Sequence, residues 1–252
     1  MEYLPGKAGD RIDFLDCPVD SFTMPEAVDH LCHCVEKGQF HQIVPVNANK
    51  LWQMAQDPKL ADIVKKAEMV IPEYAVVWGA KKLGTPLRGH VGGVMLLKEI
   101  LPVANEKGFR LYFLGAKDEV VNLMVENLRK QYEKLQIVGW HNGYLDAASE
   151  AKVLTEIQTL QPDMLFVAMG TPRQEYWIRQ NRDQLPVSVC MGVGGSFDVL
   201  AGIKKDAPAW TRKGFEWLYR LVQDPRNLWK RYLITNPWFV YHVFCAKFFR
   251  KK

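Results

Sequence analysis

The stretch DMLFVAMGTPRQEYW, residues 163–177, decides the fold. Its apolar run continues unbroken up to the Gly-Thr-Pro turn at 170–172, after which Arg173, Gln174 and Glu175 follow at once. A short apolar run bounded by a turn is typical of a parallel strand that is covered on both faces. Because ligands of parallel α/β sheets bind beyond the carboxyl ends of the strands, we expect these three polar side chains to face a ligand crevice.

The rest of the chain alternates between similar apolar runs and segments with helical periodicity. The expected strands lie at 41–47, 67–72, 109–117, 135–140 and 187–195, and the expected helices lie at 49–56, 118–132 and 148–160. This order indicates an α/β fold with a mainly parallel sheet and helices on both faces.

The bulk composition is that of an ordinary globular protein. Of the 252 residues, 48% are apolar and 24% are charged, which suits one large domain or one domain with an appendage. The five scattered cysteines suggest no disulfide framework, so we expect a reducing compartment. The N-terminal stretch MEYLPGKAGDRIDFLD has no apolar signal core, and a cytoplasmic location is therefore expected.

Charge and aromatic residues are concentrated near the C-terminus. Residues 209–252 hold ten Lys/Arg and two Asp/Glu, a net charge of +8, and because the whole chain carries +5, the first 208 residues carry −3. The same segment holds 12 of the 29 aromatic residues. We therefore predict a core over residues 1–208 and a basic, aromatic helical appendage over residues 209–252, with an anionic partner for the appendage.

The predicted partner of the appendage is a membrane surface. Its terminal apolar stretch is about 12 residues long, whereas a helix needs roughly 20 to span a bilayer. Basic amphipathic segments rich in aromatic residues lie in the interfacial plane instead. The alternative is a helix packed on the body or on a neighbouring subunit, and an exposed apolar tail also favours self-association. Nucleic acid is not the expected partner, because the basic residues are interleaved with clustered apolar ones.

The turn after the first strand has two compatible interpretations. Thr171 can be an N-cap, Pro172 suits the first helical position and Gln174 lies three residues after Thr171, which together make a capping box. A helix start of this kind also attracts anions through its N–H groups and its dipole. The pattern therefore predicts a helix start and leaves open whether a ligand binds there.

The stretch GVGGSFDVLAG, residues 192–202, repeats the arrangement at the end of the last expected strand. Its glycines allow the backbone to approach a ligand closely, and Asp198 follows within the first helical turn. The stretch is not GxGxxG and no GxxxxGK[ST] occurs in the chain, so neither a nicotinamide site nor a P-loop is expected.

Together with HNGYLD, APAW and GFEWLYRLVQDPRNLWKRY, these segments resemble the WecG/TagA/CpsF glycosyltransferases, glycosyltransferase family 26, over roughly residues 12–233. The resemblance implies a Rossmann-like domain with a C-terminal membrane-binding appendage. It also implies an inverting, metal-independent hexosyltransferase that needs no cofactor. The donor would be a UDP-sugar, with N-acetylmannosamine, its uronic acid and glucose all compatible. The acceptor would be linked to polyprenyl diphosphate at the inner face of the cell membrane, in cell-surface polysaccharide synthesis.

The same resemblance assigns candidate roles to individual residues. It implies substrate binding by Asn47, His90, Gly170, Thr171, Arg173, Gln174, Glu175, Gly194 and Asp198, with Gln174 the first candidate for contact with the nucleotide sugar. It implies binding of the acceptor diphosphate by Arg220, Arg226, Lys230 and Arg231, because arginine grips phosphates with a bidentate fork. No metal ligand is implied.

The first half of the chain departs from the family pattern. The family's PDG segment, whose Asp is the proposed base, reads Pro-Glu-Tyr here, so Glu73 is the candidate catalytic residue. Pro45 replaces a Thr, His90 replaces an Arg and Met95 replaces an Asp. These changes predict an altered sugar or acceptor specificity. One alternative is a catalytically altered member that binds a sugar nucleotide or an anionic lipid without turnover, and another is that the motif aligns differently and a different residue is the base.

One further cluster, HLCHC at residues 30–34, contains two histidines and two cysteines. A zinc site needs convergent ligands, and neighbouring residues of the helix expected there point in different directions. We therefore interpret this cluster as structural.

Overall fold

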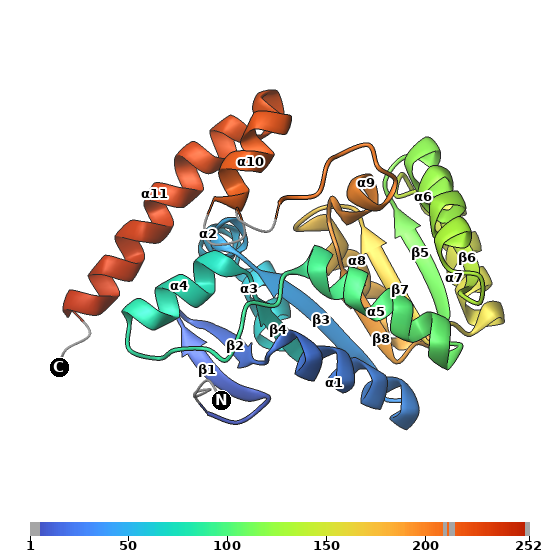
Figure 1. Cartoon of the computed structure of the whole chain (residues 1–252), viewed down its shortest axis with the longest axis horizontal. Helices are drawn as coiled ribbons and strands as arrows, with labels where there is room; N and C mark the ends of the chain where they lie inside the picture. Colours follow the sequence, from blue (N-terminus) through green and yellow to red (C-terminus); the bar gives the residue numbers. More distant parts are fainter. Residues whose placement is uncertain (1–5, 209–210, 212–214, 250–252) are drawn as a thin grey trace.

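A six-stranded sheet forms the centre of the computed structural model, which describes residues 6–208, 211 and 215–249 (Figure 1). The strand order is β4-β3-β8-β7-β5-β6, and every pair is parallel. The strands are β3 (His41–Val46), β4 (Met69–Pro72), β5 (Arg110–Gly115), β6 (Gln136–His141), β7 (Met164–Ala168) and β8 (Val189–Gly192). The six strands expected from the apolar runs are present, and the predicted α/β class is confirmed.

Both faces of the sheet are buried, as the continuous apolar runs predicted. Phe113 and Phe166 of neighbouring strands stack with ring centroids 5.6 Å apart and belong to the cluster on one face. Leu114 and Val167, one residue further along, belong to the cluster on the other face. The alternation explains why no polar residue interrupts these strands, since each successive side chain meets a layer of helices.

The helices form two layers around the sheet (Figure 1). The first layer contains α1 (Met24–Lys37), α5 (Gly93–Lys107), α6 (Asp118–Gln131) and α9 (Ser196–Leu200). The second contains α2 (Ala48–Gln56), α3 (Pro58–Lys65), α4 (Tyr74–Lys82), α7 (Ala147–Leu160) and α8 (Arg173–Asn181), which the 3-10 helix η1 (Arg182–Gln184) follows.

A two-stranded antiparallel hairpin precedes the sheet and was not expected from the sequence. It consists of β1 (Asp10–Phe14) and β2 (Cys17–Ser21). Arg11 and Asp20 attach it to the edge of the sheet: the Asp20 carboxylate accepts a hydrogen bond of 2.6 Å from the Val70 amide, and the Arg11 guanidinium donates to the Ala67 and Glu68 carbonyls. The hairpin is thus joined to β4 by side-chain contacts, which the periodicity of the sequence does not predict.

The appendage forms two helices, α10 (Glu216–Gln223) and α11 (Pro225–Phe249). Pro225 is the first residue of α11, a position that proline tolerates because its missing N–H has no partner there. Phe239 and Val243 of α11 are buried with Phe14 in the cluster that includes α2 and α4. Among the described residues, no helix has the combined length and hydropathy needed to cross a bilayer. The division into units at residue 208 stays a prediction.

Candidate active site

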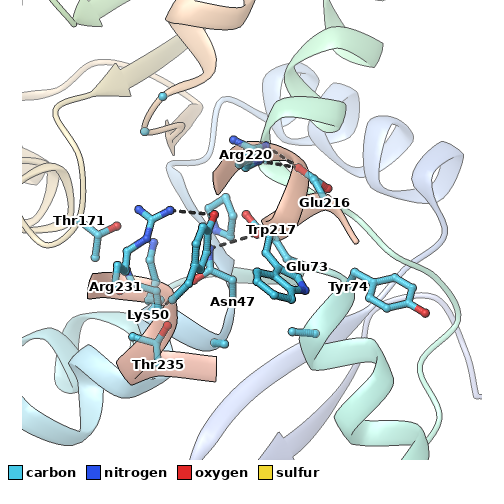
Figure 2. Close-up of a pocket in the computed structure, with 18 of the residues that line it drawn as sticks. Asn47, Lys50, Glu73, Tyr74, Thr171, Glu216, Trp217, Arg220, Arg231 and Thr235 are labelled. Carbon is cyan, nitrogen blue, oxygen red and sulfur yellow. Dashed lines mark hydrogen bonds and ion pairs between the residues drawn. The ribbon is translucent and has the colours of Figure 1, made fainter. Parts of the chain in front are cut away.

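A cavity of about 770 Å³ lies beyond the carboxyl ends of β3, β4, β7 and β8. Its other wall is formed by α10 and α11, so the core and the appendage enclose it together (Figure 2). This is the position in which open parallel sheets bind ligands, because the loops that follow neighbouring strands converge there.

Glu73 follows β4 directly and borders this cavity. Asn47 follows β3 directly and orients the Glu73 side chain. The Asn47 side chain has two partners: its Oδ1 accepts from the Lys50 amide at 3.0 Å, as the N-cap of α2, and its Nδ2 donates to Glu73 Oε2 at 3.1 Å. The Glu73 amide donates to the Val46 carbonyl at 2.9 Å, which fixes the backbone as well. The result is a half-buried carboxylate that is held toward a cavity and can accept a proton from a bound hydroxyl group.

Gln174 connects the turns that follow β7 and β8. Its Oε1 accepts from the Gly194 amide at 3.1 Å, and its Nε2 donates to Glu175 Oε1 at 2.9 Å. Gly192 must be glycine for this contact, since a Cβ there would lie 2.5 Å from Gln174 Nε2. The side chain is 2% exposed, so the two glycine-containing turns are held together by a buried amide.

A buried ion pair supports Gln174 from behind. Lys50 Nζ lies 2.6 Å from Glu175 Oε1, and the two side chains are only 5% and 1% exposed. The Thr171 hydroxyl also donates to Glu175 Oε1, at 3.3 Å. In the described part of the chain Glu175 Oε2 is buried without a partner. This pair has a large desolvation cost, and removal of either charge would leave the other buried and unpaired.

The predicted capping box at the start of α8 is wrong. The helix begins at Arg173 with Pro172 as its N-cap residue, and no side chain caps it. The Thr171–Pro172 peptide bond is cis. The Thr171 hydroxyl donates to the Glu175 carboxylate and the Gln174 side-chain oxygen accepts from the Gly194 amide, so neither side chain caps the backbone N–H groups at the start of the helix.

Two arginines of the appendage face the same cavity from α10 and α11 (Figure 2). Arg220 Nε donates to Glu216 Oε1 at 2.9 Å. Burial lowers the pKa of the Arg220 guanidinium, but the carboxylates of Glu216 and Glu73 outweigh burial and the net shift of that pKa is upward. Arg231 donates to the Tyr232 hydroxyl at 3.1 Å. The cavity therefore contains fixed positive charge close to the carboxylate of Glu73.

The structure brings together eight of the residues predicted to form the site. They line the cavity: Asn47, Glu73, Gly170, Thr171, Gln174, Gly194, Arg220 and Arg231. They come from the ends of four strands and from both appendage helices, so the first of them, Asn47, and the last, Arg231, lie more than 180 residues apart in the chain.

The other predicted residues lie outside the cavity lining. Glu175 is behind the wall, and Arg173 lines a second, smaller cavity of about 360 Å³ beside Tyr176. The His90 ring packs edge-on against Tyr74, with centroids 6.1 Å apart. The remaining three are Asp198, 3.4 Å from the ammonium of Lys204, and the exposed Arg226 and Lys230.

Several cavity residues were not identified from the sequence. Lys50 looks like an ordinary helix lysine, and Gln53, one turn later, looks like a solvated amide. Gln53 Oε1 and Thr235 Oγ1 are buried at the cavity, and neither has a partner among the described residues. Trp78 and Trp217 add aromatic walls. Only the approach of α11 to α2 gives these side chains a common environment, and no local pattern predicts that approach.

Comparison with known proteins agrees with the geometry. The model of the glycosyl transferase WecG/TagA/CpsF family matches residues 12–252. A Bacillus spizizenii protein is 33% identical over 225 residues, covering 88% of this chain and 85% of its own length. A Staphylococcus aureus protein from strain MW2 is 32% identical over 243 residues, covering 94% and 93%. Both relatives are named N-acetylglucosaminyldiphosphoundecaprenol N-acetyl-beta-D-mannosaminyltransferase.

Proposed function

This chain belongs to the glycosyl transferase WecG/TagA/CpsF family, and on that premise we propose that it moves a hexose from a UDP-sugar to a polyprenyl-diphosphate-linked acceptor. An N-acetylmannosamine-type sugar is the first candidate, because the relatives are named as N-acetylmannosaminyltransferases that act on a diphosphoundecaprenol-linked acceptor. The product would be an intermediate of a cell-envelope polysaccharide.

The observation that carries the proposal is the position of Glu73 in the cavity, between the core wall that orients its carboxylate and the appendage wall that presents cations. Asn47 holds its carboxylate from the core side, and the appendage presents Arg220 and Arg231 to the same cavity. A hydroxyl group bound between them could lose its proton to Glu73 while the cations neutralise a diphosphate.

The chemistry that this arrangement supports is a single displacement with inversion. The acceptor oxygen forms a bond to the anomeric carbon while its proton passes to Glu73. The bond from that carbon to the diphosphate oxygen breaks, and UDP leaves with the electron pair. In the proposed metal-independent reaction, Arg220, Arg231 and the start of α8 near Thr171 stabilise the charge that develops on UDP.

The appendage is proposed to place this cavity at the inner face of the membrane. The basic appendage exposes many large apolar side chains, which are Phe215, Trp217, Leu218, Val222, Trp229, Leu233, Ile234, Val240, Tyr241, Phe244 and Phe248. Side chains of this composition bind the interfacial layer, and nearby Lys/Arg residues add attraction to anionic lipid. The same surface would favour self-association when no membrane is present.

A second candidate function is binding of a sugar nucleotide without transfer. The observation that favours it is the packing of Pro45 against Gly93, where a Cβ on the glycine would lie 2.8 Å from Pro45 Cγ. A proline ring thus occupies cavity wall where the family pattern has a threonine hydroxyl.

The deciding experiment is a donor panel with a defined acceptor. Purified full-length chain would be incubated with UDP-N-acetylmannosamine, UDP-glucose and related donors, together with an N-acetylglucosaminyl-diphosphate lipid. We expect one donor to give a disaccharide lipid with inverted anomeric configuration. UDP binding, measured by thermal shift, with no turnover of any donor would favour the binding protein, and an absence of UDP binding would reject both candidates.

A further inference from the structure

Three side chains with metal-binding chemistry meet at the end of the sheet that faces away from the cavity. They are His30 and Cys34 of α1 and His41, the first residue of β3. One nitrogen or sulfur atom from each lies within 4.8 Å of those of the other two. Imidazole nitrogen and thiolate sulfur are the ligands that zinc prefers in proteins.

The elements that carry these groups are a helix and a strand of the central sheet. His30 and Cys34 are four residues apart on α1, so they lie on one face of the helix. The His41 amide donates to the Ser188 carbonyl at 2.8 Å, which fixes the start of β3 beside β8. The divergence of neighbouring helix residues, which favours a structural interpretation of HLCHC, applies to Cys32 and His33. It does not apply to the pair that shares a face, and the third ligand comes from a strand that no local pattern connects with this helix.

The orientation of the histidines also suits a metal. His41 Nδ1 lies 2.9 Å from the Gln39 carbonyl oxygen. Because a carbonyl only accepts, Nδ1 carries the proton and Nε2 keeps its lone pair, which is the arrangement that most metal-bound histidines show. The His30 ring packs between the rings of Phe22 and His41, at centroid distances of 5.3 and 5.6 Å, and forms no hydrogen bond within the described residues.

Access to the three groups is adequate for an ion. Cys34 is 2% exposed, whereas both histidines are only half-buried, so an ion can reach the cluster from the side of the imidazoles. Burial raises the pKa of the Cys34 thiol to about 11. The thiol is therefore protonated before binding and would release one proton to solvent as the metal–sulfur bond forms.

We propose that His30, Cys34 and His41 bind one zinc ion, with water as the fourth ligand of a tetrahedral site. The ion would join α1 to the start of β3. Six residues of β3, at about 3.3 Å per residue, separate His41 from Asn47 by roughly 20 Å. The site is therefore a stabilising one that takes no part in transfer, and it stands or falls independently of the proposed function.

Cobalt is the probe for the first measurement, since zinc has no visible spectrum. The tag-free full chain would be treated with a chelator and titrated with Co²⁺. We expect one equivalent to give the strong d–d bands of tetrahedral cobalt and a thiolate-to-cobalt charge-transfer band. Zinc should displace the cobalt and, at about 100 times its Kd, raise Tm by roughly 5–10 °C. An absence of stoichiometric cobalt binding would overturn the proposal.

The helix itself provides matched control variants. Cys34→Ser and His41→Gln should weaken cobalt binding at least 100-fold and abolish or distort the charge-transfer band. Cys32→Ser and His33→Ala, on the same helix but outside the cluster, should leave both unchanged. Circular dichroism would check folding, and the half-exposed His30→Gln serves if Cys34→Ser does not fold. Unchanged cobalt binding in Cys34→Ser, or equal loss in Cys32→Ser, would contradict the assignment.

Discussion

The two walls of the cavity differ in how their polar groups are held. On the core wall, hydrogen bonds connect residues that are distant in the sequence: Lys50 reaches Glu175, and Gln174 reaches Gly194. On the appendage wall, the charged groups contact their own neighbours, since Arg220 binds Glu216 four residues away and Arg231 binds the adjacent Tyr232. The polar groups of the core wall are thus held by residues distant in the sequence, whereas the two arginines of the appendage wall are held by neighbours within their own helices.

This difference indicates different roles for the two walls. Groups that are buried and fully positioned before a ligand arrives lose little freedom on binding, which suits recognition of a soluble nucleotide. Arg220 is half-buried and Arg231 is exposed, so both side chains can adjust when the appendage meets a surface, which suits a lipid-linked acceptor. We therefore expect core-wall variants to lose chemistry or stability under all conditions, and appendage variants to lose activity in a manner that depends on acceptor and lipid.

The largest expected effect is on the core wall, at Glu73. Glu73→Gln keeps an oxygen that can accept from Asn47 but cannot take up a proton, so kcat should fall about 10³-fold with donor affinity nearly unchanged. UDP release with a lipid-diphosphate acceptor measures kcat, and isothermal titration measures donor affinity. Glu73→Asp, the matched control, should retain more activity because it keeps the carboxylate. Turnover of Glu73→Gln near the wild-type level would remove Glu73 from the mechanism.

The next effect concerns the stability of the same wall. Lys50→Met leaves the Glu175 carboxylate buried and unpaired, which should lower the free energy of unfolding by about 3 kcal/mol. The matched control is Lys66→Met, whose pair with Asp62 is 57% and 55% exposed, and which should cost less than about 1 kcal/mol. Urea denaturation of both variants gives the comparison. Similar losses would mean that the buried pair has no special role in holding Gln174.

Sequence reasoning predicted the core wall better than the appendage wall, for a physical reason. Strand ends can be located from apolar runs, and parallel strands bring their carboxyl ends to one edge. Gln174 and Gly194 could therefore be assigned to one crevice from the strand pattern, whereas Asn47 and Glu73 were assigned through the resemblance to the family. The partners of these residues could not be predicted, because Lys50 becomes a buried ion only when α2 packs against α8.

The appendage shows the same limit more strongly. The sequence predicted a helical appendage but not the rotation of α11 about its axis. Arg231 and its neighbour Lys230 are both exposed, but only Arg231 lines the cavity, and the Lys230 ammonium lies 5.5 Å from the Trp229 ring. The basic residues of the appendage are chemically alike, and only the packing of the helices decides which of them line the cavity.

The third prediction tests the appendage wall at the cavity. Arg220→Ala and Arg231→Ala should each lower kcat/KM for the lipid-diphosphate acceptor by about 10- to 100-fold, the range for loss of one charge-assisted contact of roughly 1.5–3 kcal/mol. Donor affinity should change less than acceptor kinetics. Arg129→Ala on α6, whose guanidinium lies 4.8 Å from the Trp140 ring, is the matched control and should have little effect. Equal losses in the three variants would argue against an acceptor role.

The fourth prediction concerns the exposed apolar side chains of the appendage. Leu233 is 66% exposed on α11, and Leu233→Ser should weaken binding to vesicles with anionic lipid about tenfold, since part of a leucine side chain would no longer leave water. Leu123 on α6 is 39% exposed, and Leu123→Ser should leave vesicle binding unchanged. Vesicle sedimentation gives both values, and equal loss from the two variants would contradict membrane contact through α10 and α11.

The smallest effect separates the two classes of basic residue within the appendage. Arg226 and Lys230 are exposed and lie outside the cavity lining. Arg226→Ala and Lys230→Ala should each lower affinity for anionic vesicles about fivefold at low salt, corresponding to about 1 kcal/mol per charge near a lipid surface, with less effect as salt screens the attraction. Activity on a detergent-solubilised acceptor should stay close to the wild-type level in these variants, whereas Arg220→Ala should lose it there too. If Arg226→Ala lost turnover with the solubilised acceptor as strongly as Arg220→Ala, the exposed arginine would also bind the acceptor diphosphate, and the cavity would have to close around it during the reaction.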